Sequence, residues 1–493
     1  MNTHFKHILT TAITLAMILS SLIPLSPFAL KAEALEVPET PHTTSMLVYC
    51  VEAGELLGEK NADEICYPTA LTKLMTALLV SEWAKKQEDG FSTVCTVSPS
   101  AYYSTTGQDM DLFINEQLTV GTLLECLLLA GANDAANVLA EAVAGSIDAF
   151  VLMMNQKAKE LGMTDTYYAN PTGLHEDSMV TTARDQLTLA IYALTDSRIT
   201  EIAKEKTFII PQTKRHEKRS VGTRNFLVSE RTTEKYYLPI ASGLICGETP
   251  EGGFCIIGTS SHDGKNYISV LLNCETITYV DQEAVYAVDE NGDFVFDEDG
   301  NRVELVPRLT HTVYYGFTEA AEILSWADDN YDFIKAVDRH TPICEVKVKL
   351  AKNTDRVSLI PESSVEIFVP SDMDRDRDIK IEYVLDKEEL KAPVVAGQQV
   401  GTVTVYYLGE KLGDIPLVVN TAIEQNTLLV LLSAAWEFCN TPVMRVIIGL
   451  TLIGMIVYVV ITAHEREKRR KEERKRALRA GSEGAPRLSG GRR

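Results

Sequence analysis

The spacing of hydrophobic and polar positions predicts a block of helices between two groups of strands. Residues 43–64 alternate around a turn at Gly54, which indicates two strands. Apolar residues then recur with helical spacing in four segments, residues 70–86, 120–145, 147–162 and 181–194. From about 205 to 275 the pattern alternates again, and a further helix is expected at 318–334. This order predicts one α/β domain, residues 35–335, whose sheet combines both ends of the segment.

The C-terminal part of the chain has a different pattern. Residues 342–421 are rich in Val and Ile and alternate between closely spaced turns, which is typical of a small all-β domain. A juxtamembrane segment, residues 422–442, leads to a predicted membrane span, residues 443–463. This span contains one charged residue, Arg445, and is uncharged and mostly apolar from residue 446 onward. Such a stretch, at about 1.5 Å per residue, is long enough to cross a hydrocarbon core. One C-terminal transmembrane helix is therefore predicted.

An acidic insertion, residues 281–305, interrupts the first domain and contains Asn-Gly and Asp-Gly turn signals. These signals predict a small surface hairpin. Asp297, Asp299 and Asn301 alternate as the ligands of a calcium loop do, but Arg302 stands where such a loop requires glycine. We therefore expect no calcium site in the insertion.

Both ends of the chain indicate a cellular location. Residues 1–34 have a weakly basic start, an apolar middle and small residues at Ala32 and Ala34, which is typical of a secretory signal peptide. The tail, residues 464–493, carries twelve Lys and Arg against five Glu. Positive residues beside a span favour the cytoplasmic side, so we expect a single-pass membrane protein with an extracytoplasmic ectodomain and a cytoplasmic tail. The tail is then a topology determinant or, alternatively, a contact for anionic lipid or a cytosolic partner.

Composition narrows the classes of function. The formal net charge of −22 argues against a nucleic-acid partner. The nine cysteines include no C-x-x-C pair, so no zinc site and no metal is expected, and no cofactor is indicated. The sequence leaves the pairing of the cysteines open.

Five stretches of the chain, in the same order, resemble the D-alanyl-D-alanine carboxypeptidases among the low-molecular-weight penicillin-binding proteins. They are "PTALTKLMTALLVSE" (68–82), "LLLAGANDAANVLAE" (127–141), "YYANPTGLHEDSMVTTARDQL" (167–187), "SGLICGETPEGGFCIIGTS" (242–260) and "KAPVVAGQQVGTVTVYYLGEKLGDIPLVV" (391–419). The resemblance implies a penicillin-binding/β-lactamase-like α/β domain with a helical subdomain, followed by the small β domain and the membrane helix. It also implies a place in peptidoglycan metabolism, with peptidoglycan stem peptides as the ligands.

The first two motifs of that family fall at positions 70–73 and 131–133. In the family's S-x-x-K motif the serine attacks the substrate carbonyl, and the lysine one turn later accepts its proton. Here the pair is Ala70 and Lys73, so the lysine is retained and the nucleophile is absent. Gly131 replaces the second-motif serine, while Asn133 stands where the family holds the substrate amide.

The third motif, K-T-G in the family, reads Ile245, Cys246 and Gly247, so only the glycine is retained. The family lysine and threonine hold the substrate carboxylate. Because three motifs are altered together, we expect a catalytically inactive protein that binds or scaffolds in cell-wall metabolism. The alternative is an active carboxypeptidase that trims the pentapeptide stem with an unusual nucleophile, Thr69 or Cys246.

Overall fold

The computed structural model describes residues 35–230, 235–282, 285–288, 294–296, 302, 304–306 and 309–481. The predicted signal peptide and the candidate calcium positions Asp297, Asp299 and Asn301 lie outside the described residues. The chain divides into two compact units. One comprises Met1–Ile334 with Ile367–Asp374, and the other comprises Lys335–Glu366 with Arg375–Arg493.

The first unit is built on a five-stranded antiparallel sheet in the order β2–β1–β9–β8–β7. The strands are β1 (Thr43–Cys50), β2 (Glu55–Lys60), β7 (Ala241–Thr249), β8 (Gly253–His262) and β9 (Lys265–Cys274). Strand β1 pairs with β9 along its length, with Thr43 opposite Cys274 and Cys50 opposite Tyr267. The N-terminal strands therefore complete a sheet made mostly of late strands, as the order of the predicted elements requires.

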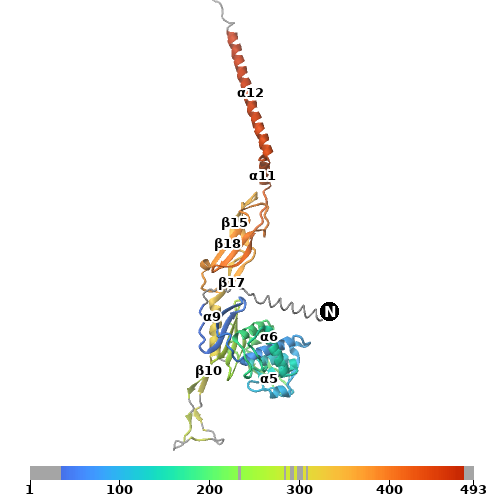
Figure 1. The fold of residues 1–493 in the computed structure, drawn as a ribbon, viewed down its shortest axis with the longest axis vertical. Coiled ribbons are helices and arrows are strands. Elements are labelled where there is room, and N and C mark those ends of the chain that lie inside the picture. Colours follow the sequence, from blue (N-terminus) through green and yellow to red (C-terminus); the bar gives the residue numbers. More distant parts are fainter. Residues whose placement is uncertain are drawn as a thin grey trace, which may run out of the picture. The chain divides into compact units, whose positions relative to one another are not determined.

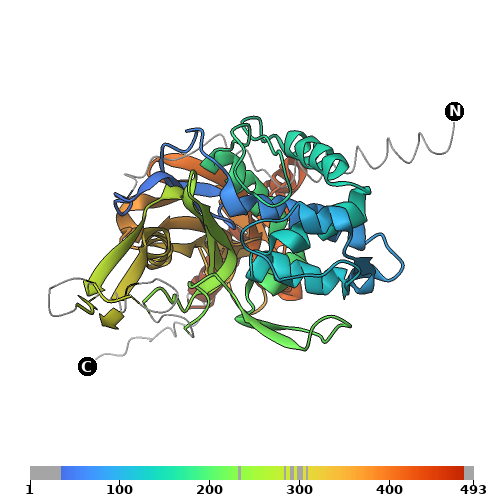
Figure 2. The ribbon, with the colours of Figure 1, turned by 90° about the horizontal axis from the view of Figure 1, so that it is seen from below.

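Each face of this sheet carries its own hydrophobic core. Neighbouring residues of one strand separate between the cores: Leu47 packs on the side of the helical block, and Val48 packs with Phe317 and Leu324 of α9 (Tyr315–Asn330). This follows from the two-residue repeat of side-chain direction in a strand. The sheet is thus a buried layer between α9 and the helical block (Figure 2).

The helical block contains seven helices among the residues described. They are α2 (Thr72–Ala84), α3 (Pro99–Tyr103), α4 (Val120–Leu129), α5 (Asn133–Ala144), α6 (Ile147–Leu161), α7 (Ala183–Ala193) and α8 (Ser197–Ala203). The predicted helical run 120–145 is two helices, because Gly131 has a φ of +71°, outside the right-handed helical region. This break makes Asn133 the first residue of α5, at the edge of the block.

Short strands complete the unit. They are β3 (Val94–Thr96) with β4 (Gln117–Thr119), β5 (Thr207–Ile210) with β6 (Arg219–Gly222), β10 (Thr276–Gln282) with β13 (Leu309–Tyr314), and β11 (Val285–Tyr286) with β12 (Glu304–Val306). The pairs β10–β13 and β11–β12 are both antiparallel, and β11 and the start of β12 belong to the acidic insertion (Figure 1). The boundary between the units runs through β14 (Tyr331–Val337) and β17 (Val365–Pro370).

The second unit contains a six-stranded sheet in the order β18–β20–β21–β16–β15–β19. The strands are β15 (Cys344–Lys349), β16 (Arg356–Pro361), β18 (Ile379–Leu385), β19 (Glu389–Lys391), β20 (Gln399–Tyr407) and β21 (Glu410–Val419), with a short helix α10 (Arg375–Asp378) before β18. Its core includes Val346, Leu359 and Leu417. This is the small β domain that the alternating pattern predicts.

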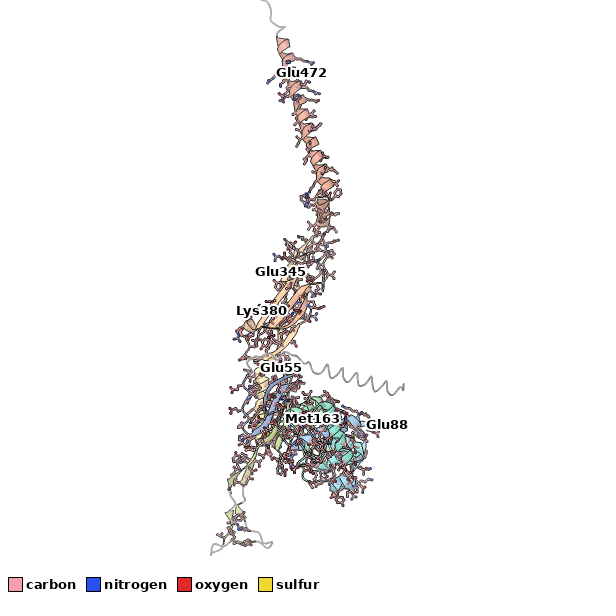
Figure 3. All side chains as sticks on the ribbon, viewed as in Figure 1. Glu55, Glu88, Met163, Glu345, Lys380 and Glu472 are labelled. Carbon is pink, nitrogen blue, oxygen red and sulfur yellow. The ribbon has the colours of Figure 1, made fainter. Side chains whose placement is uncertain are left out.

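Two helices follow the β domain, α11 (Thr427–Cys439) and α12 (Pro442–Gly481). Helix α12 is long and apolar enough to cross a membrane, and none of its most apolar stretch is buried in the protein. Most of its side chains from Pro442 to Ala477 are exposed, and Figure 3 labels Glu472 among them. The helix includes the predicted span 443–463 and continues into the basic tail.

Candidate active site

The first and third predicted motifs meet where the helical block contacts strand β7. A short 3-10 turn, Thr69–Leu71, precedes α2 and places Ala70 against the strand. A Cβ atom built on Gly247 would lie 2.5 Å from the Ala70 Cβ, so only glycine permits this approach. The structure therefore brings Ala70 and Gly247 into contact.

Lys73 lies in the first turn of α2 and is 4% exposed. Its Nζ donates a hydrogen bond of 2.5 Å to the backbone oxygen of Thr172. The Thr172 loop is fixed by Asn170, whose Oδ1 accepts hydrogen bonds from the backbone nitrogens of Thr172 (3.1 Å) and Gly173 (2.8 Å). Burial, followed by the positive charge of Arg224, lowers the pKa of Lys73 to about 7. The retained lysine is thus able to act as a base near neutral pH.

Asn133, at the start of α5, is held by the loop that follows α3. Its Nδ2 donates to the Thr106 oxygen at 2.8 Å, and its backbone nitrogen donates to the Gln108 oxygen at 2.8 Å. Its Oδ1 is buried and has no hydrogen-bond partner in the described part of the chain. A buried acceptor without a partner is costly, and a ligand N–H group would satisfy it.

Arg224, two residues after β6, occupies the space beside Gly131. Its Cδ lies 3.8 Å from a Cβ built on Gly131, and its Nη1 donates to Gln108 Oε1 at 2.7 Å. The side chain is exposed, so the guanidinium is accessible to a ligand anion. Nothing local in the sequence marks this contact, because Arg224 lies 93 positions after Gly131.

The other third-motif residues lie on opposite faces of β7. Ile245 is 2% exposed and belongs to the core shared with the helices. Cys246 is half-buried on the other face, with its Sγ 3.7 Å from the Arg224 backbone oxygen. Burial raises the pKa of Cys246 to about 12, so its thiol is protonated at neutral pH.

Thr69, the other alternative nucleophile, is 3% exposed. Its Oγ1 is 3.5 Å from the Gly247 oxygen, to which it donates a hydrogen bond. Its backbone has a φ of +46°, an unfavourable value for a β-branched residue. The hydroxyl therefore points toward the strand backbone.

Metal chemistry finds no support in the described residues, where no group of three or more His, Cys, Asp or Glu side chains is placed to hold an ion. All nine cysteines carry free thiols. The site instead combines a base with a lowered pKa, a buried amide acceptor and an exposed cation around a methyl group at position 70.

The fold and the site define a penicillin-binding/β-lactamase-like α/β domain followed by a β-rich domain and an apolar C-terminal helix. Solved structures share this fold. Penicillin-binding protein 5 of Haemophilus influenzae has a TM-score of 0.52 at 22% identity, over 79% of this chain and 100% of that one. Penicillin-binding protein 6B of Escherichia coli has a TM-score of 0.53 at 21% identity, over 78% of this chain and 98% of that one.

Sequence comparison gives the family. Residues 31–276 match the family model described as D-alanyl-D-alanine carboxypeptidase, and residues 332–425 match the one described as penicillin-binding protein 5, C-terminal domain. The D-alanyl-D-alanine carboxypeptidase DacF of Bacillus subtilis is 27% identical over 84% of this chain and 93% of its own length. DacA of Escherichia coli is 25% identical over 78% and 84%. The chain belongs to the D-alanyl-D-alanine carboxypeptidase family, which acts in peptidoglycan metabolism.

The buried lysine predicts a pH-dependent stability. Between its folded pKa of about 7 and the unfolded value of about 10.4, the unfolded chain binds more protons at Lys73 than the folded chain does. The unfolding free energy therefore gains up to about 1.4 kcal/mol per pH unit from this residue as pH rises. Urea denaturation at pH 7.0 and 8.5 should show a gain about 2 kcal/mol larger in the wild type than in Lys73→Met.

The control for this measurement is Lys86→Met, which removes an exposed lysine and is expected to keep the wild-type pH dependence. The window ends at pH 8.5, because buried thiols such as Cys66, whose pKa burial raises to about 12, oppose the trend once unfolded thiols ionise. Equal pH dependence in wild type and Lys73→Met would contradict the assignment.

Proposed function

We propose that the chain is a membrane-anchored, non-acylating member of the D-alanyl-D-alanine carboxypeptidase family that binds peptidoglycan stem peptides. The observation that carries the proposal is the methyl group of Ala70, packed against Gly247, at the position from which the family's serine attacks. A methyl group cannot form an acyl-ester. Loss of the nucleophile alone costs serine peptidases a factor of about 10⁶ in kcat.

The remaining groups suit binding. The buried Oδ1 of Asn133 is an acceptor for a peptide N–H, and the exposed guanidinium of Arg224 is a donor for a carboxylate. Arg224 lies beside Gly131, so its charge enters the region that the lost second-motif serine would occupy. A peptide with a free C-terminal carboxylate is the ligand that uses both groups.

A working carboxypeptidase is the second candidate, and the lowered pKa of Lys73 is the observation that favours it. The two alternative nucleophiles weaken it. The Thr69 hydroxyl donates to the Gly247 oxygen, and the Cys246 thiol remains protonated at neutral pH. Binding without acylation therefore has more support.

The location follows from α12 and the tail. We propose that α12 crosses the cell membrane, with residues 464–493 in the cytoplasm and residues 35–441 on the extracytoplasmic side. Labelling of intact cells with an impermeant maleimide tests this, after Cys439, the exposed cysteine just before α12, is made the only cysteine of the chain. Labelling of intact cells is expected, and labelling only after lysis would contradict the orientation.

The function is tested with the full chain in detergent, incubated with a fluorescent penicillin and analysed by intact mass. We expect no covalent adduct in the wild type, and none in Ala70→Ser, since Gly131 and Ile245 leave the other two motifs incomplete. An active family member serves as the positive control. A stoichiometric adduct in the wild type would overturn the proposal and identify the attacking residue.

Peptide binding is measured separately by calorimetry with a stem pentapeptide ending in D-Ala-D-Ala. Arg224→Gln is expected to weaken binding about tenfold, the effect of losing one charge-assisted contact. Lys86→Gln, which removes an exposed charge elsewhere, should bind as the wild type does. Equal affinity of wild type and Arg224→Gln would contradict the role of Arg224.

A further inference from the structure

One short segment of this acidic chain is strongly basic. Residues 204–224 carry seven Lys and Arg against two Glu, whereas the whole chain has a net charge of −22. The candidate site uses only the last of these cations, Arg224. Of the rest, Lys204 and Lys206 precede β5, and the other four belong to the hairpin formed by β5 and β6.

The hairpin is a regular antiparallel pair, with Thr207 opposite Gly222 and Ile210 opposite Arg219. It projects from the body of the first unit as a green ribbon (Figure 2). Residues 211–218 form its tip and contain three of the seven cations together with one acidic residue, Glu217. The strands are short, so the position of the tip depends on what holds it.

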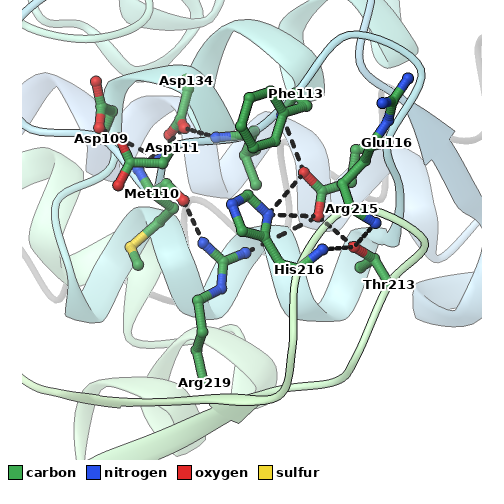
Figure 4. A network of polar contacts seen from close by, with 11 residues as sticks. Asp109, Met110, Asp111, Phe113, Glu116, Asp134, Thr213, Arg215, His216 and Arg219 are labelled. Carbon is green, nitrogen blue, oxygen red and sulfur yellow. Dashed lines mark hydrogen bonds and ion pairs between the residues drawn. The ribbon is translucent and has the colours of Figure 1, made fainter.

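A buried carboxylate holds the tip in place (Figure 4). Glu116, 2% exposed, accepts hydrogen bonds from Thr213 Oγ1 at 2.6 Å and contacts His216 Nδ1 at 3.1 Å. Arg219 reaches the same carboxylate at 3.9 Å and donates to the Met110 oxygen. Burial alone would raise the pKa of Glu116, but hydrogen bonds from Thr213, the Phe113 backbone nitrogen and His216, with the charge of His216, outweigh it and lower the pKa. The Glu116 carboxylate is thus engaged by Thr213, His216 and Arg219, and the tip has one acidic residue of its own, the exposed Glu217.

Three cations remain on the outside of the tip, Lys214, Arg215 and Lys218, which we call the basic tip. All three are exposed, and the described part of the chain provides no ion pair for any of them. Figure 4 shows the Arg215 guanidinium extending away from the anchor. Like charges this close repel one another, so the arrangement is unfavourable unless an anion approaches.

We propose that the basic tip is a docking surface for a flexible anionic polymer of the cell envelope, one that repeats carboxylate or phosphate groups. A polymer fits better than a small anion because the three cations are exposed, and one exposed ion pair contributes only about 0–1 kcal/mol. Several such contacts along one chain add up through effective concentration. The family acts in peptidoglycan metabolism, so the cell envelope is the expected source of the polymer.

The basic tip shares no residue with the candidate site, so it can hold the protein on the wall whether or not that site binds a stem peptide. The anchor gives it a fixed orientation, since Thr213 and His216 bond Glu116 from either side of Lys214 and Arg215. Substituting the three outer cations leaves this anchor intact. The proposal can therefore be tested without unfolding the hairpin.

The experiment measures fluorescence anisotropy of labelled poly-L-glutamate and labelled long-chain polyphosphate with the full chain in detergent. Lys214→Gln/Arg215→Gln/Lys218→Gln is expected to weaken binding about tenfold at low salt. The matched control Lys86→Gln/Lys159→Gln/Lys387→Gln removes the same charge from exposed lysines elsewhere. The variant Lys214→Arg/Arg215→Lys/Lys218→Arg keeps the three charges and changes the side chains. It tests whether binding depends on the charge of the tip or on the shape of its side chains. All variants retain the basic tail, whose contribution is therefore constant.

Binding that only the tip substitution weakens supports the proposal, and the preferred probe distinguishes carboxylate from phosphate. An equal loss of polymer affinity in the tip variant and the control variant would show that binding depends on net charge alone, and would overturn the proposal. Binding to vesicles of anionic lipid with none to either polymer would assign the tip to a membrane surface instead, and so contradict the proposal. A charge-preserving variant that binds no better than the neutral one would also contradict it.

Discussion

Gly173→Ala is expected to lower the unfolding free energy of the first unit by about 4 kcal/mol or more. Gly173 has a φ of +80°, and a Cβ built on it would lie 1.9 Å from the Thr69 backbone oxygen. A left-handed φ alone costs a non-glycine residue about 1 kcal/mol. No real Cβ atom lies this close to a backbone oxygen. Because the Cβ is fixed to the Gly173 backbone and the oxygen to the Thr69 backbone, either the loop at Gly173 or the turn before α2 must move.

The movement would also reach the candidate site. Thr172, the neighbour of Gly173, supplies the oxygen to which Lys73 donates, and Asn170 Oδ1 binds both loop nitrogens. Displacing this loop leaves a buried amine without its acceptor, which adds a penalty of about 1–3 kcal/mol. The measurement is urea denaturation followed by tryptophan fluorescence, because Trp83 and Trp326 both lie in the first unit.

Gly145→Ala separates the two causes of this loss. Gly145 also has a left-handed φ, +81°, but nothing lies within 4 Å of a Cβ built on it. We expect this control to lose only the backbone term, about 1 kcal/mol. If both variants lost the same amount, the contact between the Gly173 loop and Thr69 would not constrain the site.

Much of the fold was predictable because its signals are local. The spacing of apolar residues in 147–162 predicts a helix that ends at Gly162, and the structure ends α6 at Leu161 with Gly162 in the left-handed conformation. The alternation at both ends of the first domain predicts the sheet that β1 and β9 share. The break at Gly131 was less visible, because the apolar spacing continues across it while the backbone conformation does not.

The candidate site was predictable only in part, for the same reason. The stretches 68–82 and 127–141 resemble the family sequence, and this resemblance locates Ala70, Lys73, Gly131 and Asn133. Their partners are not, because the Thr172 oxygen is a backbone atom and carries no side-chain signal. Arg224 and the Glu116 anchor depend on pairs about a hundred positions apart, which only the folded chain brings together.

Ile245→Lys is expected to lower the unfolding free energy by about 3–5 kcal/mol. The substitution restores the lysine that the family has at the first position of the third motif. Ile245 is 2% exposed and packs among apolar side chains between the sheet and the helices. The residues of this cluster are apolar and offer no side-chain acceptor to an ammonium group. The new ammonium would therefore be buried without a partner.

Two measurements test this reason for the loss. Ile245→Met keeps the volume without the charge and should cost less than about 1.5 kcal/mol. The difference in unfolding free energy between the wild type and Ile245→Lys should become smaller as pH rises toward 9. A buried lysine that loses its proton no longer carries the cost of burying a charge. A deficit below about 1 kcal/mol would mean that the site still accommodates the cation. In that case the altered third motif would be a reversible change rather than one built into the core, and Gly131 would remain as the obstacle to acylation in Ala70→Ser/Ile245→Lys.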